Sequence, residues 1–461
     1  MPGRSDNRME PYRFHVFVCD QKKPEGVPCC SARGSAKVID ALRREIMAAG
    51  LAEDVQVTTC GSIGLCERGP NMIVYPEGIW YSVVQVADIP EIVSEHFQSG
   101  RVVERLANRD QAALRAEIDG NKKKMLAARA ANDAAGVLPD DFQQAVRGFQ
   151  ASRILLSAIE LDVFTAVGDG ASAETVASQL ATDPRAMAML LDALVALAVL
   201  HKDYGRYTNT PMSSRYLMAG ARDDSRAALM HTAHLWERWS TLTDCVRQGT
   251  SVTHREMVDR GDEWTTAFIA AMHRSASARA PLLVHAIDLN GVRRVLDVGG
   301  GSGAYAIAFA QANNDLRAEV FDLPTVVPIT QRHIDEADVA DRVTTRTGDL
   351  RTDDFGDGYD LVLLSAICHM MGPEENVDLL RRCFAALSPG GRIVIQDFIL
   401  APDRTAPRTA ALFAINMLVA TQQGNSYTSE EYDTWLREAG CDDVKHITLP
   451  GPTGLMIGRR E

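Results

Sequence analysis

The chain contains few aromatic residues, no excess of positive charge and no long hydrophobic run. Phe, Trp and Tyr make up 6% of its 461 residues, and 48 Lys and Arg stand against 61 Asp and Glu, for a formal net charge of −13. Binding to nucleic acid or to an anionic membrane needs clustered Lys and Arg, so we expect neither kind of partner. The longest apolar run, Ala186–Leu200, is too short to span a bilayer and contains Asp192.

The first residues, MPGRSDNRMEPYR, also lack the apolar segment of a signal peptide. We therefore expect a cytoplasmic protein. A hydrophobic content of 46% and a charged content of 24% are typical of a globular chain, and the length allows two to four domains.

Cysteine is scarce in most of the chain, but five of the nine cysteines lie in the first 66 residues: Cys19, Cys29, Cys30, Cys60 and Cys66. In a cytosolic chain, clustered cysteines indicate metal or redox chemistry before disulfides. Thiolates on the loops of a small α/β unit suit thiophilic iron, and four are enough for a [2Fe–2S] cluster. Zinc is an alternative, although the short CxxC pairs typical of zinc sites are absent.

Strand and helix patterns predict an α/β protein in four segments. Residues 12–106 alternate predicted strands and helices and form a small α/β unit. Residues 107–141, rich in Ala and charge, predict a helical or mobile linker. Residues 142–291 are almost entirely helical by period. Residues 292–461 alternate strands and helices, which predicts a parallel sheet with right-handed crossovers and ligands at the carboxyl ends of its strands.

The helical segment contains a predicted winged helix. Helix Ser172–Leu180 is followed by an Asp183–Pro184 cap, by helix Ala186–Leu200 and by a short hairpin around Gly205. A DNA-reading second helix would carry Arg, Lys, Asn or Gln, whereas this one is mostly Ala, Met, Leu and Val. We therefore expect a packing and dimerisation module.

Val295–Gly303, VLDVGGGSG, is the most informative stretch of the last segment. It predicts a buried strand followed by a glycine turn and the N-terminus of helix Tyr305–Ala312, where backbone N–H groups are free to bind a ligand. Acids follow the next strands at the positions that suit a nucleoside. Asp322 is placed to accept hydrogen bonds from a ribose diol, and Asp349 from an adenine amino group. The fourth strand ends at Ser365.

The segments LDVGGGSG, FDLPTVV, GDL, SAICHMMGPEEN and LSPGGRIVIQDFIL resemble the class I methyltransferases, specifically the plant-type O-methyltransferases and their bacterial relatives, over about residues 142–460. The resemblance implies a Rossmann-like domain that binds S-adenosylmethionine, a dimerisation region and a homodimer. The cofactor-binding residues that we expect are Gly299, Gly301, Gly303, Asp322, Asp349, Leu350 and Ser365.

The same resemblance implies that His369, in an Ile-Cys-His context, removes the proton of the acceptor hydroxyl, with Asp397 beside it as a second catalytic residue. A neutral imidazole suits this role. Two departures from the family matter: Met370 replaces the usual aspartate, and Ser426 stands near the position of a second acid. A small thiol therefore remains an alternative acceptor, because a thiol needs less help from a base.

Further candidate pocket residues come from the helical segment and from methionines near the base: His231, His234, Trp236, Trp239, Met272, His273, Met370, Met371 and Met417. A lining rich in Met suits an apolar or sulfur-containing acceptor.

The segments FVCDQ, CCSARGS and CGSIGLCERGPNMIVYPEGIWY resemble the thioredoxin-like [2Fe–2S] ferredoxins over residues 12–106. The resemblance implies Cys19, Cys30, Cys60 and Cys66 as cluster ligands, with Cys29 as a possible substitute for Cys30, and a possible redox partner protein. The spacing from Cys60 to Cys66 is longer than in the family, and Ser62 stands where a cysteine is expected. An electron-transfer protein with a non-catalytic methyltransferase scaffold is the rival from another class; Asp322 and Asp349 argue against it.

Overall fold

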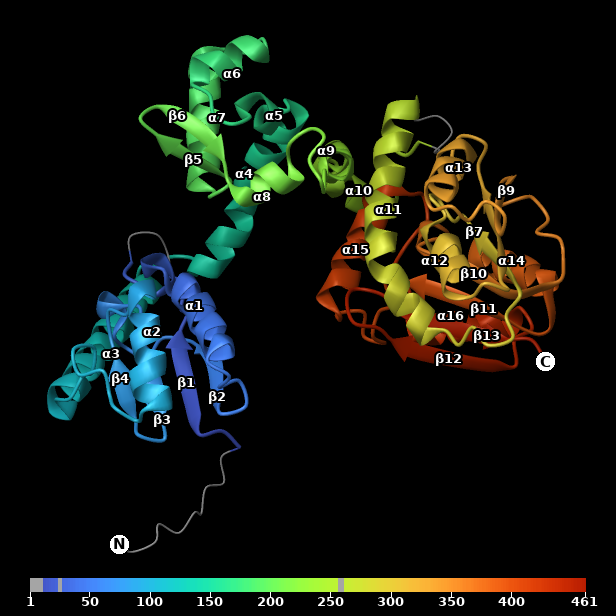
Figure 1. Ribbon diagram of the computed structural model, residues 1–461. Helices are drawn as coiled ribbons and strands as arrows, with labels where there is room; N and C mark the ends of the chain where they lie inside the picture. Colours follow the sequence, from blue (N-terminus) through green and yellow to red (C-terminus); the bar gives the residue numbers. More distant parts are fainter. Residues whose placement is uncertain (1–10, 24–26, 256–260) are drawn as a thin grey trace, which may run out of the picture. The chain divides into compact units, whose positions relative to one another are not determined.

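The computed structural model describes residues 11–23, 27–255 and 261–461, and its contacts divide the chain into two compact units. Unit 1 covers Met1–Gly148, and unit 2 covers Phe149–Glu461. Figure 1 shows the elements of both. No helix of the described residues is both long and apolar enough to cross a membrane.

Unit 1 is built on a four-stranded sheet with the order β2-β1-β3-β4. The strands are β1 (Phe14–Cys19), β2 (Val55–Cys60), β3 (Met72–Tyr75) and β4 (Ile79–Tyr81), and only the β1–β2 pair is parallel. Phe14, Val16 and Val18 alternate along β1 and are fully buried, as expected of a strand with one face in the core. That core is completed by α1 (Ser35–Ala48), α2 (Ile89–Glu91) and the π-helix η4 (Ile92–Gln98).

The segment expected as a helical or mobile linker forms the helix α3 (Gln111–Ala134), capped by the side chain of Asp110. This helix belongs to unit 1, and its first half packs against the rest of that unit. Asn121 donates a hydrogen bond to the carbonyl of Gly64 (2.8 Å), and Glu117 forms an ion pair with Arg68 (2.9 Å). The predicted helix is therefore present, and it covers the loop that joins Cys60 to Cys66.

The helical part of unit 2 starts with α4 (Asp140–Glu160), within which the boundary between the units lies. The order α5 (Val163–Val167), α6 (Ala173–Gln179), α7 (Pro184–Ala196), β5 (Leu200–Asp203), β6 (Arg206–Asn209) is that of the predicted winged helix, and β5 and β6 form an antiparallel hairpin. The side chains of Ser172 and Asp183 cap α6 and α7. Four more helices follow: α8 (Pro211–Tyr216), α9 (Arg226–Ser240), α10 (Leu242–Gln248) and α11 (Gly261–Ala286).

The rest of unit 2 surrounds a seven-stranded sheet with the order β12-β13-β11-β10-β7-β8-β9. The strands are β7 (Arg294–Val298), β8 (Arg317–Asp322), β9 (Val343–Thr347), β10 (Tyr359–Ser365), β11 (Leu387–Asp397), β12 (Asp443–Thr448) and β13 (Gly454–Arg459). All pairs are parallel except those of β13. This confirms the predicted Rossmann-like sheet.

The helices between these strands are α12 (Ala304–Ala312), α13 (Val327–Glu336), α14 (Pro373–Ala386), α15 (Arg408–Ala420) and α16 (Ser429–Glu438). The strand order reverses at β7, the first strand of the sheet in the chain, because β8 and β10 lie on its two sides. Ligands of such sheets bind beyond the carboxyl ends of the strands at this reversal. The carboxyl end of β7 carries the glycine turn.

Candidate active site

The glycine turn after β7 has a backbone that only glycine adopts without strain. Gly299, Gly301 and Gly303 have φ of 66°, 58° and 74°. A Cβ on Gly299 would lie 2.4 Å from the side chain of Ile367, and one on Gly300 would lie 2.7 Å from the carboxyl group of Asp297. The turn at the start of α12 therefore has no side chains at these glycines, and no room for them at Gly299 and Gly300.

Asp322, at the end of β8, is tied to this turn. Its Oδ2 accepts a hydrogen bond from the backbone N–H of Gly301, and its Oδ1 accepts one from Leu323, both at 2.7 Å. Burial raises the pKa of this carboxyl group to about 6. The predicted ribose acceptor thus lies against the turn, as expected of neighbouring strands in one sheet.

Asp297 is fully buried within β7, and neither of its carboxylate oxygens has a hydrogen-bond partner among the described residues. Burial, and then the charge of Asp322, raise the pKa of Asp297 to about 7. A buried carboxylate without a donor is costly, so its presence under the glycine turn fits a site that receives a cationic or hydrogen-bond-donating ligand.

The remaining predicted cofactor residues lie after β9 and at the last position of β10. Gly348 has no room for a Cβ, which would lie 2.2 Å from the ring of Phe321. The Oδ1 of Asp349 accepts a hydrogen bond from the backbone of Arg351 (2.9 Å), and the side chain of Leu350 lies over Gly299. The hydroxyl of Ser365 donates to Oε1 of Gln396 (2.9 Å). Leu350 is thus brought to the turn, and Ser365 is held by a neighbouring strand.

The predicted base and its acid form a direct pair. Nδ1 of His369 lies 2.7 Å from Oδ1 of Asp397, and the backbone N–H of His369 donates to Oδ2 of the same carboxylate (3.1 Å). His369 is 6% exposed and Asp397 is 1% exposed. Because a carboxylate only accepts hydrogen bonds, this contact places the proton of the neutral ring on Nδ1 and leaves Nε2 as the basic nitrogen.

Two further residues support this pair. The phenol of Tyr432 donates to Oδ2 of Asp397 (3.1 Å), and the ring of Phe413 meets the His369 ring edge-on, with 4.8 Å between centroids. Burial raises the pKa of Tyr432 well above its ordinary value, so this phenol is a donor. Neither residue is expected from the sequence. No local motif marks them, because they reach the site from α15 and α16.

The other predicted pocket residues are dispersed. Met371 belongs to the buried core below the base, and Met370 packs against it. Met417, on the same helix as Phe413, is buried. Trp239 donates its indole N–H to Oδ1 of Asn416 (3.0 Å), which joins α9 to α15. His231, His234 and Trp236 gather elsewhere on α9.

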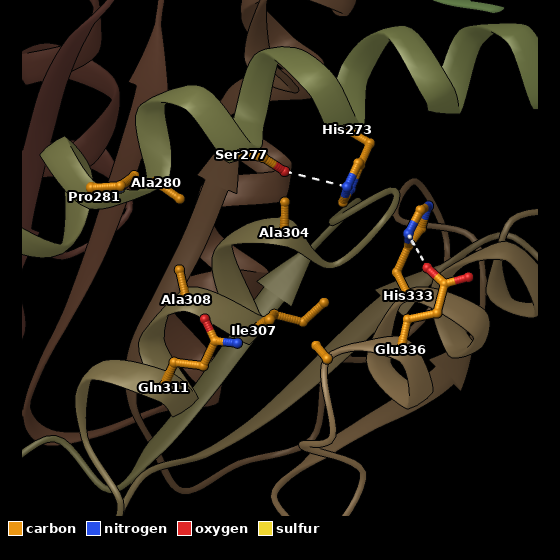
Figure 2. Close-up of a pocket in the computed structure, with 11 residues that line it drawn as sticks. His273, Ser277, Ala280, Pro281, Ala304, Ile307, Ala308, Gln311, His333 and Glu336 are labelled. Atoms are coloured by element: carbon orange, nitrogen blue, oxygen red, sulfur yellow. Dashed lines mark hydrogen bonds and ion pairs between the residues drawn. The ribbon is translucent and has the colours of Figure 1, made fainter. Parts of the chain in front are cut away.

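His273 lies in a small pocket of about 320 Å³ between α11, α12 and α13 (Figure 2). Its ring stacks on that of His333 with 4.0 Å between centroids, and its Nδ1 lies 2.9 Å from Oγ of Ser302 in the glycine turn. Small apolar side chains line most of the remainder, including Ala304 and Ala308. His273 therefore contacts the outer side of the glycine turn.

The cysteines of unit 1 lie on three neighbouring segments. Cys19 and Cys60 are paired at the ends of the parallel strands β1 and β2. A hydrogen bond from the thiol of Cys30 lowers the pKa of Cys19 to about 6, and Asn71 donates to the sulfur of Cys30 (3.4 Å). The sulfur of Cys66 lies 3.1 Å from the hydroxyl of Ser62.

These positions do not assemble a metal centre. Within residues 11–23, 27–255 and 261–461, no group of three or more His, Cys, Asp or Glu side chains is close enough to hold a metal ion. Cys29 is buried, and its sulfur accepts a hydrogen bond from the backbone of Ala32 (3.4 Å). The cluster and its ligands therefore stay a prediction.

Two family models match the chain. An O-methyltransferase domain covers residues 239–442, and an O-methyltransferase dimerisation domain covers residues 143–219. A 3-hydroxy-5-methyl-1-naphthoate 3-O-methyltransferase of Streptomyces sahachiroi is 34% identical over 320 residues, which cover 68% of this chain and 92% of the relative. Acetylserotonin O-methyltransferase of Bos taurus is 29% identical over 331 residues, covering 68% of this chain and 95% of the relative.

Solved structures of similar proteins superimpose on this chain. Human N-acetylserotonin methyltransferase in complex with SAM superimposes with a TM-score of 0.62 at 25% identity, covering 70% of this chain and 98% of that one. PigF with SAH gives a TM-score of 0.65 at 25% identity, with coverages of 70% and 100%.

Proposed function

The chain belongs to the O-methyltransferase family and is an S-adenosylmethionine-dependent methyltransferase, and we propose that it methylates the hydroxyl group of a small aromatic molecule with His369 as the base. The observation that carries this proposal is the 2.7 Å contact between Nδ1 of His369 and Oδ1 of Asp397. It orients the ring and leaves Nε2 to take the hydroxyl proton.

The residues at the carboxyl ends of the strands have the chemical groups that S-adenosylmethionine needs. When bound, S-adenosylmethionine supplies a methyl group on a positively charged sulfur. We assign the ribose hydroxyls to Asp322 and the adenine to Asp349 and Leu350. We assign the methionyl part to the backbone of the glycine turn, near Ser365. The glycines of that turn are Gly299, Gly301 and Gly303. The unpartnered carboxylate of Asp297 adds negative charge below the turn, which favours a cationic ligand.

The choice between a hydroxyl and a thiol acceptor depends on whether the acceptor needs a base to remove its proton. An ordinary phenol, with a pKa of about 10, needs a base near neutral pH, whereas a thiol of pKa about 8.5 already supplies some thiolate. Asp397 supports His369 through two hydrogen bonds, an arrangement that favours the hydroxyl. The naphthoate enzyme among the relatives acts on an aromatic hydroxyl by name. We therefore place the small thiol second.

The chain's dimerisation domain supports a homodimer. The function is tested by incubating purified protein with methyl-labelled S-adenosylmethionine and matched phenols and thiols. Transfer to a phenol that is lost in His369→Ala supports the proposal. Transfer to thiols alone, or transfer to a phenol that does not depend on His369, contradicts it.

For unit 1 we propose a thioredoxin-like domain that holds a [2Fe–2S] cluster through Cys19, Cys30, Cys60 and Cys66. The sheet order β2-β1-β3-β4, with one parallel and two antiparallel pairs, supports this assignment. So do the pairing of Cys19 with Cys60 at the ends of β1 and β2 and the hydrogen bond between the thiols of Cys19 and Cys30, whereas no group of three described side chains is close enough to hold a metal ion. The thiolates are chemically suited to iron, and an electron-transfer partner would be the corresponding ligand of this unit.

A further inference from the structure

The glycine turn, Gly299–Gly303, contains four glycines and one residue with a side chain, Ser302. Glycine loses more conformational freedom on folding than any other residue, so a turn of this composition has little preference of its own for one shape. Ser302 is 2% exposed. Its hydroxyl is therefore a buried group through which a neighbouring side chain can hold the turn.

The residue before Ser302 is held through its backbone. The N–H of Gly301 donates a hydrogen bond to Oδ2 of Asp322 (2.7 Å), and its carbonyl accepts one from the hydroxyl of Thr330 on α13 (2.5 Å). These contacts come from β8 and from the helix that follows it. They fix Gly301, and the side chain of Ser302 provides the next point of attachment.

That attachment comes from His273 on α11. Nδ1 of His273 lies 2.9 Å from Oγ of Ser302, and Nε2 lies 3.3 Å from Oγ of Ser277. A neutral imidazole donates through one nitrogen and accepts through the other, so both ring nitrogens have a hydroxyl partner. Because α11 ends before β7 begins, this contact joins the turn to a helix outside the β7–α12 segment.

His333 on α13 holds the ring of His273 from the other side. The two rings are stacked, with 4.0 Å between centroids and an interplanar angle of 8°, and Nδ1 of His333 lies 3.5 Å from a carboxylate oxygen of Glu336 (Figure 2). Burial, and then the charge of His333, lower the pKa of His273, so its ring is neutral at pH 7. The stack restricts rotation of the ring and keeps Nδ1 directed at Ser302.

We propose that His273 is a positioning residue for the cofactor, which holds the glycine turn through the Ser302 hydroxyl in the shape that receives S-adenosylmethionine. The inference rests on the proposed assignment of the turn to the cofactor. A turn that is anchored before binding has less conformational freedom to lose when the ligand arrives, which increases the affinity. His333 contributes by keeping the ring of His273 in place.

The test measures binding of S-adenosylmethionine to the full chain by calorimetry. The variants are His273→Leu, His273→Asn, Ser302→Ala and the double variant His273→Leu/Ser302→Ala. The amide of Asn occupies the place of Nδ1 and can bond to Ser302 without a ring. His285→Leu, the same substitution at an exposed position of α11, is the matched control. The thermal unfolding midpoint shows whether each variant is folded.

We expect His273→Leu and Ser302→Ala each to weaken binding roughly 3- to 10-fold, the effect of one lost hydrogen bond. The double variant should bind about as well as either single variant, because both remove the same contact. His273→Asn should bind within about twofold of the wild type, although it also loses the stack on His333. His285→Leu should bind as the wild type does.

Three results overturn the proposal. The first is unchanged affinity in Ser302→Ala, which decides the question even if His273→Leu does not fold. The second is equal weakening in His273→Leu and His273→Asn, which would mean that the ring only fills space. The third is a double variant in which the two effects multiply, because His273 and Ser302 would then act independently.

Asp322→Ala separates this inference from the proposed function. Weaker binding in Asp322→Ala with unchanged binding in His273→Leu would leave the turn as the cofactor site and refute the role of His273. Unchanged binding in both would refute the assignment of the turn and the role of His273 together. The measurement needs no methyl acceptor, so its result does not depend on whether a phenol or a thiol is methylated.

Discussion

The phenol of Tyr432 donates a hydrogen bond to Oδ2 of Asp397 over 3.1 Å, and Oδ1 of the same carboxylate lies 2.7 Å from Nδ1 of His369. Tyr432 and Asp397 are both almost fully buried. A carboxylate held from both sides keeps the imidazole in one orientation, so we infer that Tyr432 is a positioning residue for the base.

Tyr432→Phe removes this hydrogen bond with almost no change in shape. We expect kcat to fall about tenfold, with the affinity for S-adenosylmethionine unchanged, because a hydrogen bond to a charged group is worth about 1.5–3 kcal/mol. The acidic limb of the kcat–pH profile should move to higher pH, since a carboxylate with one donor fewer attracts the ring proton more strongly.

Tyr427→Phe is the matched control. Tyr427 packs against Tyr432, but its hydroxyl donates to the carbonyl of Met371 and not to Asp397. A pH profile that moves equally in both variants would mean that Tyr432 only supports packing.

His369→Ala should lower the rate of methyl transfer to a phenol by roughly 10²–10⁴ and leave cofactor affinity nearly unchanged. Single-turnover rates and calorimetry measure the two quantities separately. His285→Ala, which removes an exposed histidine at the end of α11, should change neither. An unchanged rate in His369→Ala would exclude it as the base.

Asp322→Ala should weaken S-adenosylmethionine binding by roughly 10- to 100-fold, because charge-assisted hydrogen bonds of about 1.5–3 kcal/mol are lost. Asp322→Asn keeps one acceptor and should lose less. Asp335→Ala, an exposed acid on α13, serves as the control. Calorimetry with unchanged affinity in folded Asp322→Ala protein would refute the ribose assignment.

The features predicted from local sequence patterns are present in the structure. β7 ends at the predicted glycine turn, and Asp322 and the His369–Asp397 pair follow strands as the motifs predict, because parallel strands bring their carboxyl ends to one edge. Tyr432 and Phe413 were not assigned from the sequence. Both reach the base from helices that are far apart from it in the chain, and a helical period does not predict such contacts.

Asp297 makes a pH-dependent prediction for the cofactor-free protein. Its pKa is raised from 3.8 to about 7 in the folded state, so the folded protein binds more protons than the unfolded one across this range. Stability should therefore fall as pH rises from about 4 to 7 and stay lower above 7. Asp297→Asn should reduce this loss, which thermal unfolding at pH 5 and pH 8 would show.

The same carboxylate should have the opposite effect on cofactor binding. A cation favours the ionised acid, so the affinity of the wild type for S-adenosylmethionine should increase from pH 6 to pH 8, and Asp297→Asn should bind more weakly with less dependence on pH. Affinity that is independent of pH in the wild type would show that Asp297 does not titrate in response to the ligand.

The iron–sulfur proposal predicts that protein purified without oxygen is reddish-brown, with close to two irons and two acid-labile sulfides per chain, the composition of one [2Fe–2S] cluster. Cys19→Ser, Cys60→Ser and Cys66→Ser should each bleach or strongly alter the visible spectrum, because no adjacent thiol replaces them. Cys30→Ser should shift the spectrum and keep a cluster if Cys29 is recruited, and Cys29→Ser should change little. Cys383→Ser, a buried cysteine of unit 2, is the control. Colourless anaerobic protein with stoichiometric zinc would refute the assignment and make unit 1 a structural metal module.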